Sequence, residues 1–246
     1  MSSSNSQPVA VRPSNSTLLY VAMTAAAGIA ILMQATWNLH GAGVLPLEFF
    51  CVAAATAEIS RVTAPGKSVT FSLSVAVILA SLVALGPSAA VLVAAAAALG
   101  NGFVPRIRPA HKILFNLGLY TLSAWAAGLA YSVLMVGQGH PTLSPVLVPA
   151  VALATVAYFG VNWPVLIGVI RVSTGRPVRD VWAADIGWTP GPILLASALG
   201  GAVGVNYLAL GWWGVLLMAA PLAALQFTII GHARAARTRA IEIAAA

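Results

Sequence analysis

The chain has 246 residues, of which 60% are hydrophobic and only 7% charged, and its mean hydropathy is +0.93. A soluble domain of this length carries far more charge on its surface, so the composition excludes an ordinary soluble protein. The formal net charge of +7 could suit nucleic acid, but the basic residues lie in short segments between apolar runs. That placement is typical of membrane topology and argues against a nucleic-acid partner.

Apolar runs of about 20 residues predict membrane-spanning helices and an all-α bundle in the lipid bilayer. We expect about eight spans, at roughly 17–37, 43–60, 68–85, 88–103, 112–136, 145–170, 190–208 and 212–230. Residues 1–16 predict a disordered cytoplasmic tail, residues 17–231 the transmembrane bundle, and residues 232–246 a basic, helical cytoplasmic tail.

The twelve Lys and Arg residues alternate along the predicted connections. They occupy the first tail, the connections after spans two, four and six, and the segment after span eight: Arg12; Arg61, Lys67; Arg106, Arg108, Lys112; Arg171, Arg176, Arg179; Arg234, Arg237, Arg239. The other connections, near Gly41, Gly86, Gly139 and Leu210, contain no Lys or Arg. This alternation predicts a multi-pass protein of the cell membrane with both termini in the cytoplasm.

Small residues predict where the helices pack closely. Gly86 and the following proline turn the chain from span three into span four. Span four contains an alanine run at 94–98. Ala196, Gly200 and Gly204 repeat every four residues and give span seven a small face for another helix.

Two carboxylates of the second predicted span are candidates for a functional role, because ionisable groups are costly in a bilayer. Glu58 lies near the predicted inner surface, and Arg61 three residues later favours a snorkelling or ion-paired interface residue. Glu48 lies toward the outer side. It is either a ligand or proton contact in an outward-facing cavity or an interfacial carboxylate open to water.

Polar side chains also recur in the later spans. Asn116, Tyr120 and Ser123 share one face of span five, and Asn162 lies in the middle of span six. They either form hydrogen bonds between helices or line a shared polar pocket. The residues predicted to line such a ligand site are Glu48, Asn116, Tyr120 and Asn162.

The remaining reactive side chains match no catalytic or cofactor motif. Asp180 and Asp185 lie among arginines, which favours a solvated charge cluster. The single cysteine, Cys51, excludes an intrachain disulfide, and the histidine spacing fits no metal motif. The sequence contains no phosphate loop, nucleophile elbow or zinc-protease motif. We therefore expect a non-enzymatic protein without a cofactor or a bound metal.

Four segments occur in the order 68–74 (SVTFSLS), 85–89 (LGPSA), 114–118 (LFNLG) and 122–128 (LSAWAAG), with Glu58 preceding them. Together they resemble the amino-terminal membrane sensory domains of bacterial cyclic di-GMP signalling proteins. In that family the bundle precedes an HD-GYP phosphodiesterase or a GGDEF cyclase, and these 246 residues contain neither. The resemblance implies an input module of the bacterial inner membrane that signals to a separate cytoplasmic or membrane partner through the segment after Gly231. It leaves the oligomeric state open.

A second segment, 82–92 (LVALGPSAAVL), is similar to the substrate-binding membrane components of energy-coupling-factor vitamin transporters. This similarity implies the alternative function, a transport component that binds a small solute from outside. Members of that family usually have fewer than eight spans. A small membrane enzyme acting on lipid is a third class, but the sequence lacks the clustered carboxylates or histidines that such chemistry needs.

Overall fold

The structure, a computed structural model, describes residues 13–39, 43–59, 61–63, 70–104, 107–136 and 145–217, with single positions from 221 to 231. Its elements are α1 (Asn15–Trp37), α2 (Val44–Ile59), β1 (Val62–Thr63), β2 (Thr70–Phe71), α3 (Ser74–Leu85), α4 (Pro87–Phe103), α5 (Ala110–Met135), α6 (Leu147–Thr174), α7 (Val178–Val181), the π-helix η1 (Trp182–Ile186) and α8 (Pro190–Leu210). The predicted all-α class is confirmed, because the strands form only one two-residue antiparallel pair.

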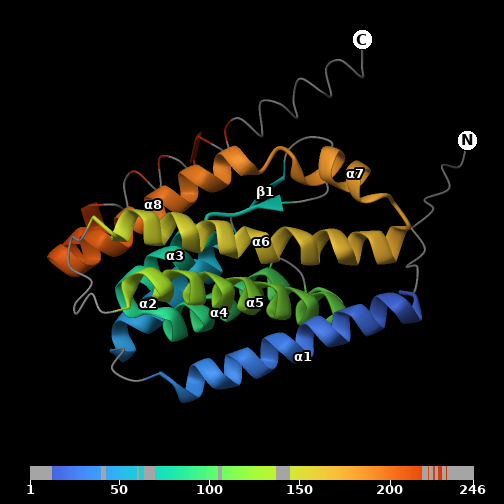
Figure 1. The fold of residues 1–246 in the computed structure, drawn as a ribbon, viewed down its shortest axis with the longest axis horizontal. Helices are drawn as coiled ribbons and strands as arrows, with labels where there is room; N and C mark the ends of the chain where they lie inside the picture. Colours follow the sequence, from blue (N-terminus) through green and yellow to red (C-terminus); the bar gives the residue numbers. More distant parts are fainter. Residues whose placement is uncertain are drawn as a thin grey trace, which may run out of the picture.

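Four helices, α1, α5, α6 and α8, are long and apolar enough to cross a membrane. At about 1.5 Å per residue, each reaches the roughly 30 Å thickness of a hydrocarbon core. They match four of the predicted spans, and in Figure 1 they run along the length of the molecule. The helices α3 and α4 are apolar but shorter. These features are compatible with an integral membrane protein.

The third predicted span, 68–85, is wrong in its first part. Residues 70–71 pair with β1, and the helix begins only at Ser74. Ser72 fixes this start, because its Oγ accepts a hydrogen bond from the backbone nitrogen of Ser74 at 3.0 Å. The helix is therefore 12 residues long, or about 18 Å. It ends at Gly86, whose φ of 90° suits glycine and turns the chain into α4.

The ends of the chain also differ from the prediction where they are described. The helix α1 already begins at Asn15, because the side chain of Ser14 accepts from the backbone nitrogen of Thr17 at 3.2 Å and caps the helix. Residues 1–12 and the predicted tail at 232–246 lie outside the described residues. Of the eighth predicted span, residues 212–217 are described in sequence and are helical.

The short helix α3 forms the centre of the bundle. It packs against α2, α4, α6 and α8, and almost all its side chains are buried. The small face predicted on span seven meets α3, where a Cβ added to Gly200 would overlap the carbonyl oxygen of Ala76. A Cβ at Gly204 would lie 2.6 Å from Cβ of Val83. Glycine at these two positions of α8 has no side chain, which lets the two backbones lie close together.

Candidate ligand-binding site

One carboxylate, Glu58, lies where four helices meet. Its side chain, near the end of α2, is only 1% exposed. Oε1 of Glu58 accepts hydrogen bonds from Oγ of Ser74 at 2.6 Å and Oη of Tyr120 at 3.0 Å. Oε2 accepts from Nδ2 of Asn101 at 3.0 Å. The donors belong to α3, α5 and α4, so this carboxylate joins α2 to three neighbours with hydrogen bonds that replace water.

The predicted ion pair between Glu58 and Arg61 is wrong. Nη1 of Arg61 donates to Oδ1 of Asn101 at 2.8 Å, and no Lys or Arg of the described segments forms an ion pair with Glu58. The helix α2 ends at Ile59, so Arg61 no longer lies at a helical i+3 position relative to Glu58. Arg61 instead binds the amide oxygen of Asn101, so that the amide nitrogen of Asn101 points toward the carboxylate of Glu58.

A cavity of about 320 Å³ lies beside Glu58, and we call it the Glu58 cavity. Its lining combines polar side chains from several elements with aromatic and aliphatic side chains, chiefly of α6. The polar lining consists chiefly of Glu58, Ser72, Ser74, Asn101, Arg108, Asn116, Tyr120 and Asn162. The α6 wall consists of Tyr158, Phe159, Trp163, Leu166 and Ile170, besides Asn162. Such a combination of apolar walls and a few convergent polar groups is typical of small-molecule sites.

The Glu58 cavity lies at the end of the bundle that carries the basic connections. Its lining comes from the last turns of α2 and α4, the start of α3, the first half of α5, the part of α6 from Tyr158 onward and the start of α8. Arg61 follows α2, Arg108 precedes α5, and Arg176 follows α6 at this same end. The turn at Gly86, which has no basic residue nearby, lies at the opposite ends of α3 and α4.

Several polar groups that line the Glu58 cavity have no protein partner in the described segments, among them those of Tyr158, Arg108 and Asn116. The hydroxyl of Tyr158 forms no hydrogen bond there, although this residue is only 4% exposed. The guanidinium of Arg108 and the amide of Asn116 also have no hydrogen-bond partner there. Burial, and secondly the positive charge of Arg61, lower the pKa of Arg108, while Tyr120 and Glu58 oppose this shift. Arginine nevertheless stays protonated in proteins.

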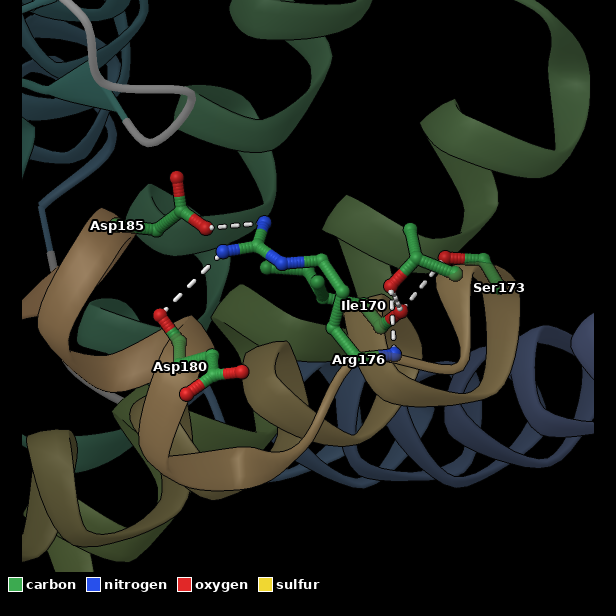
Figure 2. Close-up of polar contacts among 6 residues, drawn as sticks. Ile170, Ser173, Arg176, Asp180 and Asp185 are labelled. Atoms are coloured by element: carbon green, nitrogen blue, oxygen red, sulfur yellow. Dashed lines mark hydrogen bonds and ion pairs between the residues drawn. The ribbon is translucent and has the colours of Figure 1, made fainter.

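The segment from Arg176 to Thr189, which we call the α7–η1 segment, reaches the Glu58 cavity at its last residue. Figure 2 shows Arg176 donating from Nη1 to Oδ2 of Asp185 at 2.9 Å and from Nη2 to the backbone oxygen of Asp180 at 3.3 Å. Asp185 is 4% exposed, so the predicted solvated cluster is wrong for this residue. Thr189 lines the cavity directly after η1. The ion pair therefore fixes a segment that leads into the cavity wall.

The structure brings three of the four predicted site residues together. Asn116, Tyr120 and Asn162 line the Glu58 cavity, and Nδ2 of Asn162 also donates to Oγ of Ser123 at 3.3 Å. Glu48 is exposed and lies ten residues before Glu58 on α2, about 15 Å away along the helix axis. The sequence signal that could have identified Glu58 as central is the presence of polar side chains on three other apolar helices.

A second hollow of about 840 Å³ lies between α6 and α8 at their other ends. Its lining is mostly aliphatic, and Thr155 and Asn206 donate within their own helices, to the carbonyls of Val151 and Ala202. The hydroxyl of Ser197, which also lines the hollow, is buried without a partner in the described segments. This groove matches the chemistry of a hydrocarbon chain better than that of a polar solute. Within the described residues, no group of three His, Cys, Asp or Glu side chains could hold a metal ion.

Comparison of the chain with protein-family models, with curated proteins and with solved structures finds no match. The functional argument therefore depends on the Glu58 cavity itself.

Proposed function

We propose that this chain is a non-enzymatic sensory module of the cell membrane that binds a small organic solute in the Glu58 cavity. The observation that carries the proposal is a buried carboxylate beside a cavity whose lining includes polar groups without a partner in the described segments. An ionisable side chain is retained inside a bilayer mainly for function, because its burial is costly. In this proposal, ligand binding between α2, α5 and α6 changes how the module contacts a separate signalling partner.

The proposed topology has eight spans, with both termini and the Glu58 cavity on the cytoplasmic side. Basic residues favour the cytoplasmic side, and the cavity is at the end of the bundle that carries them. A ligand would therefore enter from the cytoplasm. This direction suits a sensor of an internal metabolite better than the capture of a solute from outside.

Transport of a small solute is the second candidate function. It is favoured by the meeting of polar groups from α2, α5 and α6 in one cavity, as a solute site within a bundle requires. A transporter moves its ligand across a sealed membrane, whereas a sensory module binds the ligand and does not move it. Flux of a bound solute into proteoliposomes would favour transport over sensing.

The test of ligand binding is the melting temperature of the purified protein against a panel of metabolites. A ligand at 100 times its dissociation constant adds about 2.7 kcal/mol to the free energy of unfolding. We expect a shift that is lost in Asn116→Ala and kept in Asn206→Ala, which makes the same change outside the cavity. Binding to inverted but not right-side-out vesicles is also expected. A panel without any shift, or a shift that survives Asn116→Ala, would contradict the proposal.

A further inference from the structure

We infer that the ligand of the Glu58 cavity carries an anionic group, a carboxylate or a phosphate, that binds Arg108 while an aromatic or other apolar body packs on α6. This inference rests on the proposed ligand-binding function and specifies the chemistry of the ligand.

The unpartnered groups that face the cavity are rich in hydrogen-bond donors. The guanidinium of Arg108 is donor-only, and the Tyr158 hydroxyl and the Asn116 amide each supply donors as well. Tyr158 is 4% exposed as a residue, and its hydroxyl lines the cavity without a protein partner in the described segments. A ligand oxygen that accepts hydrogen bonds would satisfy these groups. A carboxylate or a phosphate suits the guanidinium best, because its oxygens can accept two parallel N–H bonds.

The charge that Arg108 presents to the cavity is not neutralised by a close carboxylate of the described residues. The side chain is only partly exposed, and the charge of Arg61 acts on it from the same end of the bundle. Two cations in a partly desolvated region repel each other, and an anion placed between them and the cavity relieves this repulsion. The electrostatics of the cavity mouth therefore favour a negative ligand.

Glu58 does not reverse this preference, although it also lines the cavity. Its side chain is 1% exposed, and both its oxygens already accept hydrogen bonds from Ser74, Asn101 and Tyr120. Its charge also acts on Arg108, but both carboxylate oxygens are already occupied by donors of the bundle. Arg108 remains the charged group with unused donors at the cavity surface.

The α6 wall of the cavity indicates the chemistry of the ligand's apolar part. The rings of Tyr158, Phe159 and Trp163 follow one another along α6, with centroids 5.0 Å and 5.2 Å apart. Leu166 and Ile170 extend this wall toward the helix end. A volume of about 320 Å³ lies at the small end of the range for ligand pockets. The cavity thus suits a compact molecule with one anionic end and one apolar face.

The anionic group can come from a soluble organic acid or from an anionic lipid headgroup, and the experiment separates these sources. Calorimetric titration in neutral detergent would compare benzoate, indole-3-acetate and phenyl phosphate with neutral benzamide and cationic phenethylamine. Melting in nanodiscs with and without phosphatidylglycerol forms the lipid arm. We expect an acid or the anionic lipid to bind, and Arg108→Gln to weaken that binding about 10- to 100-fold.

Arg171→Gln is the matched control, because it removes an exposed positive charge at the same end of the bundle, outside the cavity lining. Tyr158→Phe, which keeps the ring, should weaken binding less than Arg108→Gln. The inference is overturned if neither the acids nor phosphatidylglycerol bind in an Arg108-dependent way. A neutral or cationic compound that binds in an Asn116-dependent way would overturn it too, while leaving the proposed function intact.

Discussion

Glu58→Ala should destabilise the protein far more than Glu48→Ala, although both remove a carboxylate from α2. The buried carboxylate accepts three hydrogen bonds from other helices, whereas Glu48 is exposed. Hydrogen bonds between membrane helices contribute about 0.6 kcal/mol each on average and up to about 1.7 kcal/mol. Losing three of them lowers the free energy of unfolding by about 2–5 kcal/mol, and Glu48→Ala changes it by less than about 0.5 kcal/mol.

The assay is unfolding by SDS in mixed micelles, followed by the fluorescence of the seven tryptophans. Glu58→Gln keeps an acceptor oxygen and should cost less than Glu58→Ala. In a double-mutant cycle with Tyr120→Phe, the two effects should be less than additive by about 1 kcal/mol, because both changes remove the same hydrogen bond. Equal stability of the two alanine variants, or full additivity with Tyr120→Phe, would refute the hydrogen-bond network.

Two further substitutions test how the helices and the α7–η1 segment are held. Gly200→Leu should destabilise the bundle by about 1–3 kcal/mol or prevent folding, because α8 lies against the backbone of α3 there. Gly160→Leu, on an exposed helix position with no atom within 4 Å, should be tolerated, and equal melting temperatures of the two variants would contradict this packing. Asp185→Asn should lower the free energy of unfolding by about 1 kcal/mol, a modest loss because the partner in the ion pair, Arg176, is partly exposed. The same substitution should speed tryptic cleavage near Arg176. Asp180→Asn should do neither, because Arg176 bonds its backbone oxygen, and a matching effect there would count against the ion pair.

The sequence predicted the helices well because the signal is local. In a bilayer every backbone polar group must be satisfied within the segment, so a long apolar run can only be a helix. The four long helices follow this rule, and the small face at Ala196, Gly200 and Gly204 could likewise be read from one helix. The start of the third segment was mispredicted because hydropathy over a short stretch does not distinguish the strand β2, Thr70–Phe71, from the beginning of a helix.

Only the tertiary structure decided which polar residues belong to one site. The partners of Glu58 lie 16, 43 and 62 residues away in the sequence, and no local periodicity relates them. Their meeting depends on the short α3 at the centre of the bundle and on the close approach of small residues between helices. The sequence by itself determined the helical, apolar character of the chain. The packing of the helices determined that Glu58, rather than Glu48, lies with Asn116, Tyr120 and Asn162, because hydrogen bonds between helices depend on distances that composition does not encode.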